Sequence, residues 1–500
     1  ANELRKKYRI CISAVAMAAL LAGAAACSSQ TAGTGSASGS DAVSTAEAAA
    51  DQQTESAQDA EEASSGTGEQ AQDENAAEET GSSRDENAAE DAESAQGTEA
   101  AEADEAGESE TEAVTALAVM PGPAKEEIAV GETVENTEDG GHAILADGEE
   151  LSYTGVAVVK SGDSDSGDEA DFYGDNAAVF ATNGGTLNLT GVTVETAGTH
   201  ANGVFSYGEG TTVNISDSYI ETSGNCSGGL MTTGGGTMNA ENLTINTSGN
   251  SSAAIRSDRG GGTVNVTGGS YTTTGVGSPV VYSTADITVN SAEMTSTASQ
   301  GVVVEGKNSV TLNNVELTAD NNQKNSNHSD YYQAVMIYQS MSGDAAEGTS
   351  SFTMNGGTLT NQNGDVFFIT NTATTVDLTD AAITNNDADG IFLRAAAAGW
   401  GNEGSNGGHI NLTAAKQAID GDMVVDDVSE LNLYLKENST FTGAVNSDGA
   451  AGSVYVEIED GSTWVLTGDS HITALTCGAD AIDLNGYTLY VNGVALTGTK

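Results

Sequence analysis

The side chains best suited to binding chemistry lie in three segments that are longer than the surrounding repeat requires. These segments cover residues 319–333, 340–350 and 395–408. Binding sites are usually built on loops that a rigid scaffold positions, and an exposed tryptophan beside carboxylates and carboxamides suits stacking against a sugar ring. The predicted ligand-binding residues are Arg259, Tyr331, Tyr332, Asp344, Glu347, Arg394, Trp400, Asn402 and Glu403.

Two of these segments are expected to emerge at one corner of the fold. Segments 340–350 and 395–408 both lie between the first and second strands of a repeat, two repeats or about 10 Å apart. The alternative is structural: Trp400 packs on the flank of the protein and Arg394 pairs with a nearby acid. Arg256 raises a related question, because sister repeats place apolar side chains at its position. If that column faces outward, it forms an apolar ladder on a groove.

The segment from Asp163 to Asp171 is the candidate for a metal site. Asp163, Asp165 and Asp168 alternate with small residues and can present hard oxygen ligands to Ca²⁺. The segment departs from the EF-hand pattern, because Gly174 stands where the bidentate glutamate belongs. The alternative is a solvated acidic loop. Ca²⁺ is therefore the one cofactor that the sequence leaves open, and no other cofactor is expected.

The scaffold beneath these segments is a repeat with a period near 25 residues. Corresponding apolar residues are Val179, Val204, Leu230 and Ile255, at spacings of 25, 26 and 25. Within one repeat, apolar and polar residues alternate over Val204–Tyr207, Val213–Ser216 and Tyr219–Thr222, which predicts three short strands. A period of this length with Gly, Asn and Asp turns is typical of stacked coils. The predicted fold is all-β: a right-handed parallel β-helix (solenoid) of about 12 coils, roughly 58 Å long.

The β-helix is predicted over residues 114–423, and residues 424–500 are predicted to be terminal β coils that close the stack. Weaker copies of the repeat have their first apolar positions predicted at Val280, Val303, Met336, Phe368 and Phe392. Cys226 and Cys477 lie in different coils, roughly 40 Å or more apart, and a disulfide needs Cα atoms within about 7 Å. Both are therefore predicted to be free thiols.

Residues 1–26 have the pattern of an export signal. A basic cluster around Arg5 precedes an apolar run that ends at Ala26, directly before Cys27. Cys27 resembles the lipidated cysteine of bacterial lipoproteins, and the alternative is ordinary signal cleavage near Ala26. We expect an extracellular protein that is anchored to the membrane of a bacterium, with a Gram-positive source favoured.

Residues 27–113 are predicted to be a disordered acidic linker. Between Asp41 and Glu112 there are 24 acids, one base and no aromatic residue, so this stretch cannot bury enough apolar area to offset the cost of ordering its backbone. The net charge of the whole chain is −58. Such a polyanion lacks the basic face that binding to nucleic acid or anionic lipid requires. Membrane contact is therefore expected only through the lipid anchor, and we expect a monomer.

Several stretches resemble a known group of proteins. They are Phe172-Tyr-Gly-Asp-Asn-Ala-Ala-Val, Gly203-Val-Phe-Ser-Tyr-Gly, Ser252-Ala-Ala-Ile-Arg-Ser-Asp-Arg-Gly-Gly-Gly-Thr-Val-Asn-Val, Val335-Met-Ile-Tyr-Gln-Ser-Met-Ser-Gly-Asp and Gly399-Trp-Gly-Asn-Glu-Gly-Ser-Asn-Gly-Gly. With these stretches the chain resembles uncharacterised surface β-helix lipoproteins of gut Clostridia, which are related by fold to pectin-lyase-like and autotransporter-adhesin β-helices. The resemblance covers residues 140–500. It implies a fold and a cell-surface location, and it brings no catalytic residues with it.

These observations predict a surface-anchored β-helix binding protein, an adhesin for a carbohydrate (glycan) or a surface protein of the host or of a bacterium. The alternative is a polysaccharide-degrading enzyme, a lyase or a glycoside hydrolase. The hydrolases of this fold resemble one another through Asp-Asp and Gly-His-Gly segments, which Asp426-Asp427 and Gly408-His409 match only in part. An enzyme predicts three or more carboxylates that converge in one groove with room for a sugar. An adhesin predicts a shallow aromatic and polar patch.

Overall fold

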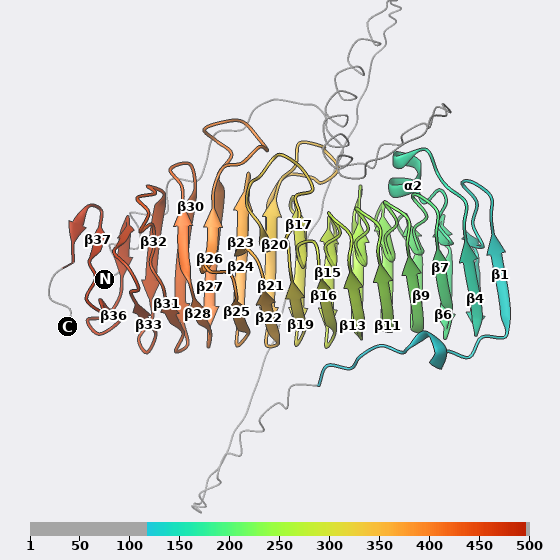
Figure 1. Ribbon diagram of the computed structural model, residues 1–500, viewed down its shortest axis with the longest axis horizontal. Coiled ribbons are helices and arrows are strands. Elements are labelled where there is room, and N and C mark those ends of the chain that lie inside the picture. The colour runs from blue at the N-terminus through green and yellow to red at the C-terminus, as the bar shows by residue number, and fades with distance from the viewer. Residues whose placement is uncertain (1–117, 497–500) are drawn as a thin grey trace, which may run out of the picture. The chain divides into compact units, whose positions relative to one another are not determined.

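The strands of this protein stack into an elongated parallel β-helix (Figure 1). The computed structural model describes residues 118–496. The predicted fold class, an all-β stack of coils, is confirmed for this part of the chain. The predicted export signal at 1–26, the lipidation site at Cys27 and the linker at 27–113 lie outside the described residues.

Two long parallel sheets form the body of the stack. Each coil adds one strand to a sheet of 11 strands, which we call the narrow sheet, and one or two strands to a sheet of 20 strands, the wide sheet. The narrow sheet consists, in order, of β2 (Ile144–Asp147), β5 (Val179–Thr182), β8 (Val204–Tyr207), β10 (Leu230–Thr233), β12 (Ile255–Ser257), β14 (Val281–Ser283), β17 (Val302–Glu305), β20 (Gln333–Tyr338), β23 (Asp365–Thr370), β26 (Ile391–Ala395) and β29 (Asp422–Val425).

The wide sheet bends around the other two faces of the coils. Its strands are β1 (Glu132–Asn136), β3 (Glu150–Thr154), β4 (Val156–Lys160), β6 (Thr186–Thr190), β7 (Thr193–Thr196), β9 (Thr212–Thr222), β11 (Gly236–Thr247), β13 (Gly262–Thr273), β15 (Asp286–Asn290), β16 (Glu293–Ser296), β18 (Ser309–Asn313), β19 (Glu316–Ala319), β21 (Thr349–Asn355), β22 (Thr358–Asn361), β24 (Thr372–Thr379), β25 (Ala382–Asn385), β27 (Gly408–Ala415), β30 (Glu430–Lys436), β32 (Ser453–Ile458) and β35 (Ala474–Thr476).

The second and third predicted strands of a coil are continuous in part of the molecule. The coil that begins with β8 has its first strand where it was predicted, whereas the other two merge into β9. β11 and β13 are continuous in the same way, and all three strands contain a residue with positive φ: Asp217, Asn242 and Gly268. Later coils keep two separate strands, as in β15 and β16. A single left-handed residue thus turns the corner without ending the strand, which hydrophobic alternation does not reveal.

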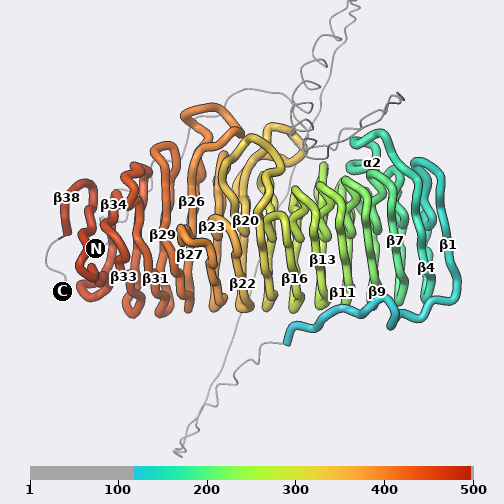
Figure 2. Tube along the Cα trace, in the orientation of Figure 1, coloured from blue at the N-terminus to red at the C-terminus, as the bar shows by residue number. Residues whose placement is uncertain are grey.

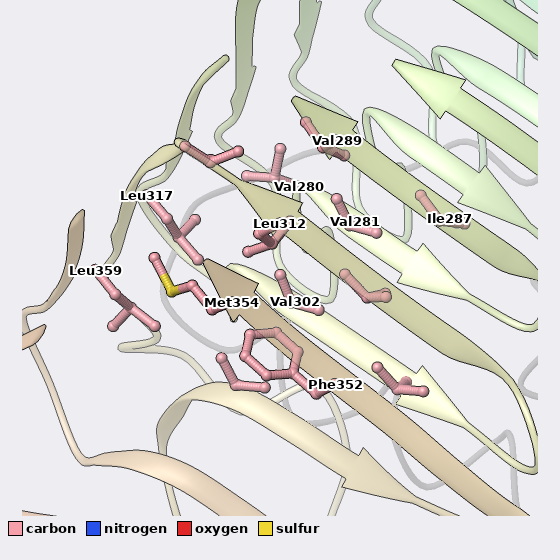
Figure 3. Packing of buried hydrophobic residues seen from close by; sticks show 14 of the residues in the cluster. Val280, Val281, Ile287, Val289, Val302, Leu312, Leu317, Phe352, Met354 and Leu359 are labelled. Carbon is pink, nitrogen blue, oxygen red and sulfur yellow. The ribbon is translucent and has the colours of Figure 1, made fainter. Parts of the chain in front are cut away.

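The interior of the stack is a continuous hydrophobic core. Alternate side chains of each strand point inward, so that corresponding residues lie above one another on successive coils. Figure 3 shows this order for Val281 and Val302 of the narrow sheet, packed against Leu312, Phe352 and Met354 of the wide sheet. All five side chains are fully buried.

The register of the later coils differs by one residue from the prediction. The inward column of the narrow sheet continues through Ile255, Val281, Val302, Val335, Phe367 and Leu393. The positions predicted at Val280, Val303, Met336, Phe368 and Phe392 are therefore wrong by one residue each. In each of these strands a residue next to the core residue is apolar and buried as well, so that period-two alternation gives no signal.

The prediction of two free thiols is wrong at Cys226, which takes part in a disulfide. Cys477 is free, so no bond joins these two cysteines, and the stacked coils can keep them apart. The spacing argument concerned only a bond between Cys226 and Cys477, so it could not exclude a disulfide at Cys226.

The chain enters the stack from its side. Residues 118–131, which we call the strap, run along the stack from β13 toward β1 (Figure 2). The Gly269 N–H donates to the Met120 carbonyl over 2.8 Å, and the Thr244 hydroxyl donates to the Pro123 carbonyl over 2.6 Å. The strap is therefore fastened to strands that are far from it in sequence.

The remaining elements are two short helices and the last coils. The helices are η2 (Lys125–Glu127), in the strap, and α2 (Gly167–Tyr173). The last coils form a sheet of β28 (Ala418–Asp420), β31 (Thr440–Thr442), β33 (Thr463–Val465) and β36 (Ile482–Asp483), and another of β34 (Ser470–Ile472), β37 (Leu489–Val491) and β38 (Val494–Ala495). Trp464 is fully buried there and stacks on Phe441, with ring centroids 5.4 Å apart.

Candidate functional site

Each strand of the narrow sheet turns one side chain outward next to its core residue. We call this column the outer ladder, and strand pairing places Arg256 in it between Met231 and Tyr282. The ladder faces away from the main core, and its apolar members form two separate clusters. From Phe180 to Phe368 it is covered by other parts of the chain, so it is not an open groove there, whereas Leu145 is exposed. Its members are Leu145, Phe180, Phe205, Met231, Arg256, Tyr282, Val303, Met336, Phe368, Arg394 and Val424.

The first cover is α2 with the residues beside it. Phe172 is buried, and its carbonyl accepts a hydrogen bond from the Thr233 hydroxyl over 2.6 Å. Gly174 ends the helix in a left-handed conformation and lies so close to Phe180 that an added Cβ would be 2.1 Å from that ring. Only glycine fits such a position. The helix thus closes over the apolar beginning of the outer ladder.

The second cover is an arch of three loops. They are residues 320–332, 339–348 and 396–407. The first loop precedes β20 and the third follows β26, so they approach the narrow sheet from opposite strand ends, on the side of the molecule that carries α2 (Figure 1). They meet where the His328 ring stacks on Trp400 at 5.0 Å between centroids, and where the Gly399 N–H donates to the His328 carbonyl over 2.6 Å.

A pocket with a cavity volume of about 110 Å³ lies under this arch. We call it the arch pocket. Its aromatic lining residues are Tyr282, Tyr331, Tyr332, Tyr338 and Trp400, and its carboxamide lining residues are Gln300, Asn321, Gln323, Asn325 and Gln333. Lys324 is its one charged lining residue, and that ammonium pairs with Asp330. No carboxylate lines the pocket, which is notable in so acidic a chain.

Three of the predicted ligand-binding residues, Tyr331, Tyr332 and Trp400, come together in the arch pocket. A fourth, Arg394, supports its wall: the guanidinium lies 4.2 Å above the Tyr331 ring and donates to Asp365 over 2.7 Å. Burial raises the pKa of Asp365 to about 6, although the arginine opposes the shift. The structural alternative considered for Arg394, pairing with an acid, is therefore realised.

The other predicted binding residues lie apart from the pocket. Arg259 donates to Asp344 over 2.6 Å and lies 4.0 Å above the Phe172 ring, so it joins the two covers. Glu347, Asn402 and Glu403 are exposed on the loops and do not line the pocket.

Sequence reasoning missed a buried hydrogen-bond network beside the arch pocket. Glu305, at the end of β17, accepts hydrogen bonds from the hydroxyls of Tyr282 and Ser340. The Tyr338 hydroxyl lies 3.3 Å from that of Tyr282. Burial raises the pKa of Glu305 above its ordinary value, and burial likewise holds the pKa values of both tyrosines well above theirs.

A second buried cluster links the outer ladder to α2. Arg256 donates to Asp258 over 2.9 Å and lies 3.6 Å from Asp171, which also faces the His200 ring at 3.2 Å. Burial, together with the charges of Asp171 and Asp344, raises the pKa of Asp258 to about 7 in spite of Arg256. Asp171 and Asp258 share the Arg256 guanidinium. The protonated form of Asp258 is therefore favoured.

Of the weak metal candidates and the partial hydrolase match, Asp163 and Asp426 have structural partners. Asp163 accepts a hydrogen bond from the Thr199 N–H over 2.7 Å, while Asp165 and Asp168 are exposed beside and within α2. No group of three or more metal-ligating side chains occurs within residues 118–496. Asp426 accepts hydrogen bonds from the backbone N–H of Ala397 over 2.8 Å and from the Ser429 hydroxyl, which fixes a turn.

A second, open groove crosses the wide sheet. It has a cavity volume of about 440 Å³ and runs over β6, β9, β11 and β13. One asparagine per coil donates its side-chain amide to the asparagine before it, over 2.9–3.0 Å. These residues are Asn188, Asn214, Asn239 and Asn265. The amides satisfy one another along the ladder, so this groove is explained by packing of the stack.

No protein-family model, no curated protein and no solved structure matches this chain. Between residues 118 and 496, no helix is both long and apolar enough to cross a membrane.

Proposed function

We propose that this protein is a binding protein of the bacterial cell surface and that the arch pocket holds a neutral sugar unit of a glycan. One observation carries the proposal: the pocket wall includes five aromatic and five carboxamide side chains and no carboxylate, in a chain of net charge −58. Aromatic faces suit the apolar faces of sugar rings, and carboxamides both donate to and accept from hydroxyl groups.

Cleavage of a polysaccharide receives less support. Glycoside hydrolysis by two carboxylates requires both to flank the scissile bond, and no carboxylate lines the arch pocket. Asp171, Asp258, Glu305 and Asp344 do come near one another, but each is buried or engaged beneath the covers. These acids therefore hold the covers in place.

Glycan-array screening followed by calorimetry tests the proposal. Substitutions Trp400→Ala and Tyr332→Ala are expected to weaken binding of any hit about tenfold or more, because each removes an aromatic wall. Tyr487→Ala is the matched control, since Tyr487 is an exposed aromatic residue in the last coils. Binding that both pocket variants retain, or release of cleaved product, would contradict a binding role for the pocket.

We also infer that Cys27 anchors the chain to the membrane, on the strength of the export pattern that precedes it. Metabolic labelling with an alkyne fatty acid is expected to mark the full-length protein, and Cys27→Ser is expected to abolish the label. Equal labelling of both proteins would refute this location of the anchor.

A further inference from the structure

A buried carboxylate lies behind the wall of the arch pocket. Glu305 is only 2% exposed. Its Oε2 accepts the hydrogen bond of the Tyr282 hydroxyl, and its Oε1 accepts that of the Ser340 hydroxyl. Tyr282 lines the arch pocket, as does Tyr338 next to it. The pocket wall and the buried acid are thus in direct contact.

The groups around Glu305 come from four elements. Tyr282 belongs to β14, Tyr338 to β20, and both Ser340 and Asp344 to the loop 339–348. Asp258, which follows β12, acts on both tyrosines through its charge. The two arginines nearby are engaged elsewhere, Arg256 with Asp258 and Arg259 with Asp344, and none of the ion pairs in residues 118–496 includes Glu305.

We propose that Glu305 is a positioning residue that sets which hydrogen-bonding role Tyr282 offers to a ligand. When Glu305 is ionised, it holds the hydroxyl proton of Tyr282, so the phenol oxygen can only accept a hydrogen bond from the pocket side. When Oε2 takes up a proton from solvent, the carboxyl group donates to the phenol oxygen. The Tyr282 hydroxyl proton is then free to point into the pocket.

This inference rests on the proposed function and narrows its ligand class. In the ionised state the pocket selects a ligand group that only donates a hydrogen bond at Tyr282, such as the N–H of an acetamido sugar. Because burial raises the pKa of Glu305, the change of role falls at a higher pH than for an ordinary glutamate. Affinity for a donor ligand should therefore rise with pH through that midpoint.

The first test needs no ligand. The tyrosine Raman doublet distinguishes a hydroxyl that donates a hydrogen bond from one that accepts it. Subtracting the spectrum of Tyr282→Phe from that of the wild type leaves the doublet of Tyr282. The doublet ratio of this difference is expected to change with pH in the wild type and to stay constant in Glu305→Gln, whose amide does not titrate. A ratio that is independent of pH in the wild type overturns the proposal.

The second test measures affinity against pH by calorimetry, with the glycan that the array identifies. Wild-type affinity is expected to change about three- to tenfold, the effect of one hydrogen bond, and Glu305→Gln is expected to remove the dependence. Glu347→Gln and Asp427→Asn are the matched controls, since both acids are exposed and neither lines the pocket, and both variants should keep the wild-type profile. Loss of the profile in a control instead of in Glu305→Gln overturns the proposal.

The two tests separate this inference from the proposed function. If no glycan binds, or if Trp400→Ala binds as the wild type does, the sugar pocket is wrong, and the Raman experiment still decides the role of Glu305. If glycans bind at the pocket and Glu305→Gln keeps the wild-type pH profile, the pocket stands and the role of Glu305 is refuted.

Discussion

Single charged residues over the narrow sheet fasten the covers to the strands. Arg259 lies on Phe172 and pairs with Asp344, so it connects α2 with the loop 339–348. Arg394 connects β23 with the arch in the same manner, through Asp365 and Tyr331. An arginine can do both because its planar guanidinium stacks on a ring and still donates from its edge. Both arginines therefore hold the covers in place without lining the arch pocket.

Burial of Asp258 and Asp365 makes the free energy of unfolding depend on pH. Asp258 has a pKa of about 7 and Asp365 of about 6 in the folded protein, above the ordinary aspartate value of about 3.9. Between about pH 4 and 7 the unfolded chain loses protons that the folded chain retains, so the free energy of unfolding should fall as pH rises, by up to about 4 kcal/mol for Asp258.

Urea unfolding at pH 4.5 and pH 7.5 measures this dependence. Asp258→Asn should show a smaller fall than the wild type, while Asp427→Asn, at an exposed acid, should match the wild type. A free energy of unfolding that is constant or that increases over this range would contradict the argument.

At the scale of elements, the first half of the stack depends on close backbone contact at one turn of the coils. A column of glycines occupies this turn: a Cβ added to Gly224, Gly249 or Gly275 would lie 1.8–2.0 Å from the carbonyl oxygen of the glycine one coil earlier. None of these three residues has positive φ. The requirement for glycine is therefore one of space between coils, and not of backbone conformation.

Gly249→Ala is accordingly expected to destabilise the protein by about 2 kcal/mol or more, because two coils must separate to admit the methyl group. The matched control is Gly131→Ala, since a Cβ at Gly131 would meet nothing within 4 Å. Thermal unfolding of both variants measures the difference. Equal melting temperatures would show that the turn can accommodate a methyl group, and would contradict the requirement for glycine at this position.

The stack could be predicted from the sequence, and the site only in part. Val179, Val204 and Leu230 recur at nearly constant spacing, and the long loops stand out as departures from it. Glu305 gave no signal, because its partners Tyr282 and Ser340 lie 23 and 35 residues away. Only the exact register brings them together, and in those strands apolar residues on both faces hide the register.

At the scale of the whole molecule, most surface charge is of one sign. Residues 114–500 contain 48 acids and 10 bases, and the described ion pairs use few of them. Corresponding side chains of successive coils lie only about 4.8 Å apart. Like charges in one column therefore repel across neighbouring coils, as Glu293 and Glu316 do on paired strands.

Salt should consequently stabilise this protein. Raising NaCl from 20 mM to 500 mM shortens the screening length from about 20 Å to about 4 Å, which weakens repulsion along the columns more than it weakens the buried pairs. We expect the melting temperature to increase by several degrees, in differential scanning calorimetry at pH 7.5. A decrease would mean that attractive surface pairs outweigh the repulsion.

The strap gives the molecule a defined response to mechanical force. Tension applied through the residues before Met120 reaches the stack at β13, on its flank, and not at its first coil. The contact between Met120 and Gly269 breaks first, then that between Gly122 and Ser270, and then that between Pro123 and Thr244, so the strap peels one hydrogen bond at a time. Peeling needs less force than shearing all the bonds together. The strap can therefore lengthen under a pull while the coils, and the pocket they carry, stay folded.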